Sequence, residues 1–177
     1  MKLSPLALKR QAILQIREQY TLPSDIQPTR WGINKTWTRT DFLKGILWTV
    51  FSRFVRMRDM GLLAKKYYEG DKRFIGVCIS CGCRKDYAEM QAGHFAPVAG
   101  GSIEQCFDEK NVNAECAGCN ADFHNWHLIP MRRNLIVKYG EPTVINIERV
   151  RSQKLAVKWT ERDFVERIHF YYKAINK

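Results

Sequence analysis

Apolar residues recur with a helical period in two stretches of the N-terminal part of the chain. Ser4 followed by Pro5 is a typical helix start, and apolar side chains then fall on one face as far as about Tyr20. A second amphipathic stretch runs from Asp41 to about Arg58, with its apolar side formed by Leu43, Leu47, Val50, Phe51, Phe54 and Val55. The pattern predicts two helices, joined by a connector without a clear period.

The C-terminal part shows the same kind of pattern. A helix is predicted over 128–139 because Gly140 follows it, and another over about 143–151. Thr160 and Asp163 have the spacing of a capping box and predict the start of a last helix. Its inward residues are expected to be Phe164, Ile168, Tyr171 or Tyr172, and Ile175. Helical flanks therefore surround a centre that is rich in loops, which indicates an α+β, mostly helical fold.

Charge separates the centre from the flanks. The 177 residues carry a formal net charge of +11. Residues 1–77 hold 15 basic and 6 acidic side chains, residues 78–120 hold 3 and 6, and residues 121–177 hold 11 and 6. Basic flanks are expected to contact a polyanion, and an acidic centre is expected to hold cations. The alternative is that Lys and Arg simply cover solvated helix faces.

Hydropathy limits the identity of the polyanion. The longest apolar stretch, around 43–55, is interrupted by polar side chains, so no segment reaches the length that spans a bilayer. The N-terminus also lacks the apolar core of a secretory signal. We therefore expect no membrane partner and a cytoplasmic protein. Because thiols stay reduced there, the six cysteines call for an explanation other than disulfides.

Two Cys-x-x-Cys pairs give that explanation. Cys78 and Cys81 form the first pair, and Cys116 and Cys119 the second, so that together they supply the four ligands of a structural zinc site. A thiol-redox pair is the alternative for either pair alone. Four sulfur ligands leave no open position on the zinc, so any chemistry requires other residues. Cys83 and Cys106 remain over, and no role is assigned to them.

Histidines and asparagines lie around these pairs in a recognisable order. After Cys78-Ile79-Ser80-Cys81-Gly82 come Gly93-His94, Gly100-Gly101, Asn111, and then Cys116 to Asn120 with His124 four residues further. This order resembles the HNH nucleases. Within them, the stretch Phe54-Val55-Arg56-Met57-Arg58-Asp59, the segment Ala92 to Phe95, Leu128-Ile129-Pro130 and Tyr139-Gly140 resemble phage recombination proteins of the NinG (Rap) type.

The resemblance implies a ββα-metal fold and a division of the chain into four segments. These are an N-terminal helix and connector (1–40), a basic helix (41–77), a zinc-knuckle HNH-like core (78–127) and C-terminal helices (128–177). It also implies an endonuclease that hydrolyses DNA phosphodiester bonds with Mg²⁺ or Mn²⁺. The NinG type suggests branched recombination intermediates such as Holliday junctions as substrate, and symmetric incision of a junction suggests a homodimer.

The HNH pattern assigns roles to individual residues. His94 is expected to be the general base, with the unperturbed pKa near 6.5 that suits this task. Asn111 would orient the histidine loop. Asn120 and His124, one helical turn apart, would share a helix face and bind the catalytic cation. Phosphate contacts are expected from Lys44, Arg53, Arg56, Arg58, Arg132 and Arg133.

Each assignment has a structural alternative. His94 could satisfy a backbone carbonyl, Asn111 could be a turn residue, and Asn120 could close the zinc knuckle. His124 or His127 could be packing or supporting groups. The protein would then be a non-catalytic zinc-knuckle DNA-binding protein. An HNH nuclease that cuts ordinary duplex DNA is a further alternative.

One position departs from the commonest HNH pattern. An acid that binds the metal normally precedes the base histidine, and this chain has Gly93 there. Glycine has no side chain with which to bind an ion, so either a neighbouring carboxylate replaces the acid or the metal is held more weakly. The candidates taken from the sequence are Asp86, Glu89, Asp108, Glu109 and Asp122.

Overall fold

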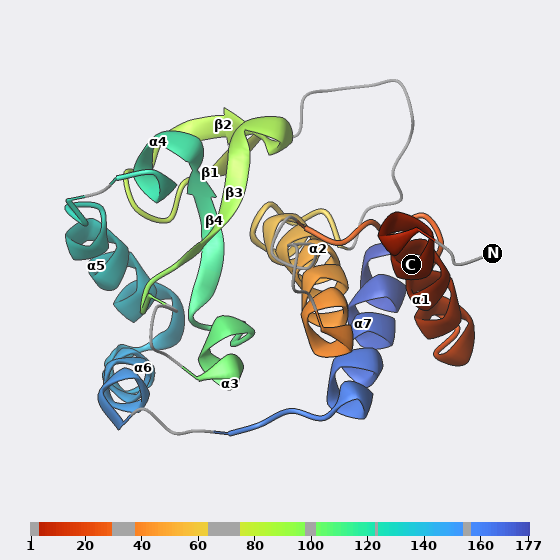
Figure 1. Ribbon diagram of the computed structural model, residues 1–177. Coiled ribbons are helices and arrows are strands. Elements are labelled where there is room, and N and C mark those ends of the chain that lie inside the picture. The colour runs from red at the N-terminus through yellow and green to blue at the C-terminus, as the bar shows by residue number, and fades with distance from the viewer. Residues whose placement is uncertain (1–3, 30–37, 64–74, 98–101, 123, 154–156) are drawn as a thin grey trace. The chain divides into compact units, whose positions relative to one another are not determined.

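The computed structural model of the chain describes residues 4–29, 38–63, 75–97, 102–122, 124–153 and 157–177. These residues form two compact units, whose elements are labelled in Figure 1. The first unit combines residues 1–51 with 159–176, and the second contains residues 52–158. The order of segments along the sequence therefore differs from their grouping in space. Residues 30–37 of the predicted connector and the Gly100-Gly101 pair lie outside the described residues.

Helices alone form the described part of the first unit. They are α1 (Pro5–Gln19), the N-terminal part of α2 (Arg39–Asp59) and α7 (Glu161–Ile175). The predicted caps are confirmed, since the Ser4 side chain caps α1 and Thr160 and Asp163 form the capping box of α7. Tyr171 is buried on α7, with its ring centroid 5.0 Å from that of Phe51 on α2. All three predicted helices are thus present, packed through their apolar faces.

Two antiparallel strand pairs lie at the centre of the second unit. The first joins β1 (Ile75–Val77) to β2 (Arg84–Asp86), and the second joins β3 (Met90–His94) to β4 (Val112–Cys116). Short helical turns connect them: η2 (Tyr87–Glu89), α3 (Ile103–Cys106) and α4 (Ala117–Asn120). In the second pair Met90 faces Cys116 and His94 faces Val112. β3 therefore runs from the cysteine end of the pair towards α3, as Figure 1 shows.

Two longer helices complete the second unit. α5 (Leu128–Tyr139) ends at Gly140, whose φ of 83° is left-handed, as the sequence predicts. α6 (Glu141–Gln153) begins earlier than expected, because Pro142 fits the first turn of a helix, where its missing N–H is not needed. Both helices contribute to a core of Phe95, Ala96, Met131, Leu135, Val144 and Ile147. This core fixes the chain directly after His94.

Candidate functional site

Four cysteine sulfurs meet where the two strand pairs approach each other. Cys78 and Cys81 lie in the turn between β1 and β2, Cys116 ends β4, and Cys119 lies in α4. Their ligand atoms all lie within 4.8 Å of one another. The Sγ atoms of Cys81 and Cys116 are 3.9 Å apart, and sulfurs bound tetrahedrally to one zinc ion at 2.3 Å would be about 3.8 Å apart. The cluster could therefore hold a metal ion such as zinc.

Backbone hydrogen bonds shape the first knuckle around these sulfurs. The Cys78 amide donates to the Cys83 carbonyl (2.9 Å), and the Gly82 amide donates to the Cys78 carbonyl (3.0 Å). Gly82 has a φ of 71°, a conformation that glycine adopts without steric cost. The Cys116 amide donates to Cys78 Sγ at 3.3 Å, which joins the second knuckle to the first. The chain thus brings the sulfurs together through its own hydrogen bonds.

The sulfurs affect one another's ionisation. Burial and hydrogen bonds with the sulfurs of Cys81 and Cys116 raise the pKa of Cys119. Hydrogen bonds with the same two sulfurs, together with burial, raise the pKa of Cys83 to about 12. Thiols this crowded resist becoming thiolates unless a cation stabilises the charge, and thiolates are what zinc binds. Cys106, the sixth cysteine, is buried on α3 and takes part in a different contact.

That contact involves His94. The Nε2 of His94 lies 3.0 Å from the backbone carbonyl of Cys106. A carbonyl can only accept, so Nε2 carries the hydrogen and Nδ1 carries the basic lone pair. Burial lowers the pKa of His94, and the hydrogen bond to Cys106 only partly opposes this effect. The expectation of an unperturbed pKa is therefore replaced by a lowered one, which keeps the ring neutral at pH 7.

Asn111 holds the loop that follows His94. Its side chain is completely buried; Oδ1 accepts from the Ala96 amide (2.7 Å), and Nδ2 donates to the carbonyls of Ala96 (3.1 Å) and Gln105 (2.9 Å). One amide group thereby links the segment after His94 to α3, which carries the Cys106 carbonyl. The predicted action of Asn111 on the histidine loop matches these contacts.

A buried carboxylate lies over Gly93, and sequence reasoning missed it. Glu115 on β4 has no exposed surface, and a Cβ at position 93 would overlap its Oε2. The same Cβ would lie 3.0 Å from Oδ1 of Asn120. Two oxygens therefore converge on the space that the glycine leaves open. The signal in the sequence is a glutamate at a strand position that must be buried, directly before a zinc-ligand cysteine.

Glu115 has further polar neighbours. The Ser80 hydroxyl donates to its Oε1, and Nε2 of His127 lies 3.9 Å from the same oxygen. Burial raises the pKa of Glu115, while the Ser80 hydrogen bond and the charge of His127 oppose the increase. Nδ1 of His127 lies 3.4 Å from Asp122 Oδ2, so the ring stands between two carboxylates.

The structure corrects the predicted helix face of Asn120 and His124. α4 ends at Asn120, so His124 lies beyond the helix in an exposed turn, where its amide donates to Asp122 Oδ1. The one-turn helix is too short to place the two side chains on one face. His127, which received no role, is the histidine that faces Glu115.

Of the five carboxylates expected to replace an acid at position 93, three have local structural contacts. Asp86 and Glu89 close the capping box of η2, and Asp108 accepts from the Lys110 amide. Asp122 lies 3.4 Å from Nδ1 of His127, the histidine whose Nε2 is near Glu115. The nearest acid to Gly93 is therefore Glu115, which lies on the partner strand.

The basic residues fall into two groups. Arg58 is committed to the fold: it pairs with Asp59 and donates to the carbonyls of Glu109 (2.6 Å) and Val112 (3.0 Å). The guanidinium of Arg56 lies 4.4 Å from the centroid of the Tyr87 ring. These contacts argue against Arg58 as a phosphate ligand, because its donors are already used inside the protein. By contrast, Arg53 and Arg133 are exposed, and Lys44 is half-buried.

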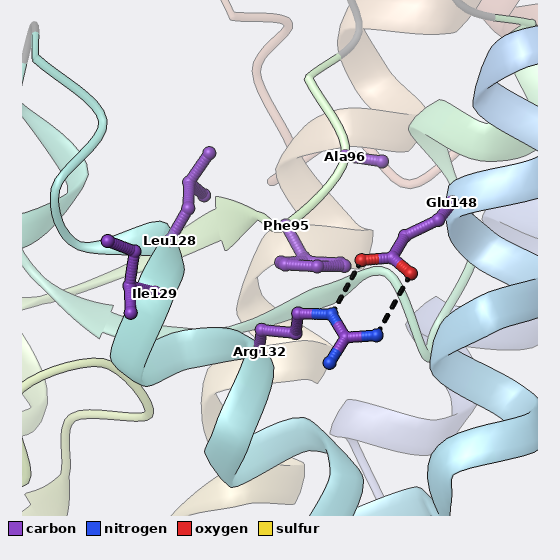
Figure 2. Close-up of a pocket in the computed structure, with 6 residues that line it drawn as sticks. All are labelled: Phe95, Ala96, Leu128, Ile129, Arg132 and Glu148. Carbon is purple, nitrogen blue, oxygen red and sulfur yellow. Dashed lines mark hydrogen bonds and ion pairs between the residues drawn. The ribbon is translucent and has the colours of Figure 1, made fainter.

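Arg132 borders a cavity of about 310 Å³ beside the segment that follows His94. Figure 2 shows its guanidinium paired with Glu148, together with the Phe95 ring and the aliphatic side chains of Leu128 and Ile129. The shorter N···O distance is 2.8 Å, and each side chain is 40% exposed. Arg132 therefore has a carboxylate partner yet remains accessible from solvent, unlike Arg58.

Asp59 joins the end of α2 to β4 and α5. Its Oδ2 accepts from the Ala114 amide (2.8 Å), and its Oδ1 lies 2.7 Å from Lys138 Nζ. Burial alone would raise the pKa of Asp59, but the hydrogen bonds and charges of Arg58 and Lys138 outweigh it and hold the pKa below its ordinary value. This cluster positions the strand that carries both Glu115 and Cys116.

Comparison with known families assigns the chain. The family model of the bacteriophage lambda NinG protein matches residues 29–177. The chain belongs to the NinG family. This match includes the cysteine cluster, His94, Glu115 and the helices that follow them, and it makes the chain a member of a phage protein family. Comparison with curated proteins and with solved structures finds no match. Within the described ranges, no helix is long and apolar enough to cross a bilayer.

Proposed function

We propose that this NinG-family protein is a metal-dependent endonuclease that hydrolyses phosphodiester bonds of DNA. The observation that carries the proposal is a half-buried histidine at the end of β3, held by the Cys106 carbonyl, one residue after a glycine over which two side-chain oxygens converge. A proton acceptor and oxygen ligands for a cation are the two kinds of group that metal-assisted hydrolysis uses, and β3 carries His94 directly after the glycine on which the oxygens converge.

The proton acceptor would be Nδ1 of His94. Its Nε2–H is held by the Cys106 carbonyl, so the ring is oriented before substrate arrives. Nδ1 would take the proton of a water molecule as the water oxygen bonds to phosphorus and the ester P–O bond to the leaving strand breaks. Asn111 would keep the base in place through the loop and α3. A bound Mg²⁺ or Mn²⁺ would stabilise the negative charge on the phosphate and the leaving oxygen.

The four cysteines would bind a structural zinc ion rather than a catalytic one. Four thiolates complete the tetrahedral coordination of zinc, which leaves no site for water or phosphate. The zinc would instead fix the relative positions of the two strand pairs, and through Cys116 it would fix the end of β4 that carries Glu115.

DNA contact would rest on the basic flanks. Arg53 and Arg133 are exposed and Arg132 is accessible, so they can approach phosphates, and Lys44 adds a further charge on α2. Branched recombination intermediates such as Holliday junctions are the substrate that the family resemblance suggests. A homodimer would supply the two incisions that resolution of a junction requires.

Cleavage assays with a matched histidine control test the proposal. Zinc-loaded protein is mixed with a four-way junction or with linear duplex of the same sequence, in Mg²⁺ or Mn²⁺. His94→Ala should bind DNA and lose cleavage, whereas His169→Ala should cleave normally, since His169 lies in the first unit, where its Nε2 is 3.1 Å from the Tyr20 carbonyl. Binding without cleavage by the unmodified protein under both metals would reject the nuclease.

A second candidate is a non-catalytic zinc-knuckle protein that binds DNA. The contact that favours it is the hydrogen bond from His94 to the Cys106 carbonyl, because a purely structural histidine makes the same bond. The two candidates differ in the His94→Ala result: a structural role predicts a lower melting temperature, while catalysis predicts lost cleavage with little change in DNA affinity. Equal cleavage of junction and linear duplex would favour a nuclease of ordinary duplex DNA.

A further inference from the structure

Glu115 carries a buried side-chain oxygen that accepts no hydrogen bond within the described residues. The residue has no exposed surface, and its Oε2 has no hydrogen-bond partner within the part of the chain that the structure describes. The other oxygen accepts from Ser80. Removing a carboxylate oxygen from water without a donor is unfavourable, so such an atom normally faces a proton or a cation. The missing partner must approach from the side on which Oε2 lies.

Oε2 lies on the side of Gly93, and a second oxygen faces the same point. Asn120 Oδ1 would be 3.0 Å from a Cβ at position 93, and Oε2 would overlap that Cβ. The amide of Asn120 is held in this orientation, because its Nδ2 donates to Gln91 Oε1 at 2.6 Å. The nitrogen therefore points to Gln91 and the oxygen points to the space above the glycine.

His127 lies near the other oxygen of the Glu115 carboxylate. Asp122 Oδ2 lies 3.4 Å from its Nδ1, and its Nε2 lies 3.9 Å from Glu115 Oε1. A carboxylate that accepts from one nitrogen of a histidine leaves the lone pair on the other nitrogen, which is how histidine ligands are commonly oriented towards metal ions. The side chain of His127 is only 10% exposed, so its position is fixed.

We propose that Glu115, Asn120 and His127 bind one divalent cation of the Mg²⁺ or Mn²⁺ class. Two oxygens and one imidazole nitrogen suit such an ion, whose remaining positions would hold water or phosphate oxygens. The site is separate from the four sulfurs, which are soft ligands that select zinc. A role of this cation in catalysis rests on the proposed nuclease function. Binding of the cation does not depend on that function.

This assignment also explains the glycine. In the commonest HNH pattern the acid stands directly before the base histidine, on the first strand of the hairpin, whereas here the acid would come from the second strand. Because the Glu115 carboxylate fills the position of a side chain at 93, the two arrangements exclude each other sterically. The proposed site therefore requires glycine at position 93, because any larger residue there would displace the Glu115 carboxylate. His127 takes the place expected for His124.

Mn²⁺ binding measures the site directly. Mn²⁺ forms weaker complexes than zinc with such ligands, so it should leave the zinc in place, and its electron paramagnetic resonance signal reports the free ion. Zinc-loaded protein is titrated as unmodified chain, as Glu115→Gln and as Glu89→Gln, a carboxylate control on η2 that faces Lys85. Glu115→Gln should bind Mn²⁺ at least about tenfold more weakly, and Glu89→Gln should match the unmodified chain. Equal affinity of all three proteins, or no binding by the unmodified chain, would overturn the proposal.

Thermal unfolding provides a readout that does not depend on activity. Mn²⁺ should raise the melting temperature of the unmodified protein and leave that of Glu115→Gln unchanged, because a ligand stabilises only the state that binds it. A purely structural pair of Glu115 with His127 predicts the same response in both proteins and would reject the site. Zinc content is measured in every variant, so that a loss of folding is recognised.

Moving the acid back to β3 separates the two proposals. Gly93→Asp combined with Glu115→Ala should regain Mn²⁺ affinity that Glu115→Ala alone has lost, whereas Gly93→Asp alone should overlap Glu115 and unfold at a lower temperature. Mn²⁺ binding that depends on Glu115 without any cleavage would reject the nuclease and keep the site. Metal-dependent cleavage that is unchanged in Glu115→Gln would keep the nuclease and reject the site.

Discussion

The carboxylate of Glu115 occupies the space in which a side chain at Gly93 would stand. Glu115 pairs with Gln91 across the hairpin, and its side chain leans along the strands towards the glycine two residues further on β3. The side chains at these two positions, which are 22 residues apart in the sequence, would therefore compete for the same space. A substitution at either position has to be judged together with the other.

Gly93→Ala is expected to destabilise the protein by about 1–3 kcal/mol, the usual cost of inserting a methyl group into a filled interior. Gly118→Ala is the control, because a Cβ at position 118 would have no described atom from elsewhere in the fold within 4 Å. Urea unfolding of the zinc-loaded proteins measures both. In Gly93→Ala combined with Glu115→Ala, the cost of the added methyl group should largely disappear. Strictly additive effects would show that the two residues do not share this space.

Cys116→Ala is expected to abolish tight zinc binding, since it removes one of four ligands and the residue that joins β4 to α4. Cys83→Ala should retain zinc, because Cys83 lies outside the four-sulfur cluster. Zinc released by a thiol-modifying reagent, followed with a colorimetric chelator, gives the stoichiometry. We expect one zinc ion per unmodified chain and per Cys83→Ala chain. Zinc lost from Cys83→Ala would mean that the ligand set is different.

Asp59→Asn should cost about 3 kcal/mol of unfolding free energy at pH 7, because it leaves Arg58 and Lys138 without their carboxylate. The folded-state pKa of Asp59 is lowered, so its stabilisation is complete above the unfolded pKa near 3.9 and is lost as the pH falls through the folded value. The stability difference between the two proteins should thus be constant from pH 7 to about pH 5 and shrink below about pH 4. A difference that grows on acidification would contradict this role.

The cleavage rate should depend on pH through His94. Burial lowers its pKa, so the base remains neutral well below pH 7, and the rate should reach half of its plateau at a pH below 6.5. Single-turnover rates at saturating Mg²⁺, taken where the protein retains its zinc, give the profile. Loss of half the rate already above pH 7 would indicate another titrating group. The variant His94→Gln should show only residual cleavage without this titration.

Arg53→Ala and Arg133→Ala should each weaken DNA binding at every sequence and reduce the slope of log affinity against log salt by about 1, as expected for loss of one phosphate contact. Both side chains are exposed, so the melting temperature should hardly change. Arg58→Ala should show the opposite behaviour, with lower stability from the loss of the Asp59 pair and the carbonyl contacts. If both exposed variants kept the same slope of log affinity against log salt as the unmodified protein, the DNA would bind elsewhere on the protein.

Helices were the most predictable part of this fold. Their caps and apolar periods are local, and Ser4, the Thr160 capping box and Gly140 lie where the pattern puts them. The cysteine cluster was predictable for a related reason, because two close Cys-x-x-Cys pairs have the spacing that supplies four ligands to one metal ion. The grouping of both chain ends into one unit was not predictable, since it depends on packing between distant helices.

The polar site was only partly readable. His94 and Asn111 stand in a recognisable order, but the replacement for the acid at Gly93 depends on strand register, which places Glu115 opposite Gln91. Closeness to the motif along the chain points to exposed carboxylates such as Glu89 and does not identify the buried Glu115. The prediction of His124 requires a helix that continues past Asn120, whereas α4 has a single turn.

Glu115 and Cys116 are consecutive on β4, so the two proposed ions share one segment of backbone. An oxidant that joined two of the four thiols would release the zinc and free the end of this strand. The carboxylate would then leave its place above Gly93 although no oxidant had touched it. The proposed nuclease activity would therefore depend on the redox state of the surroundings, and reducing conditions would be needed to preserve it.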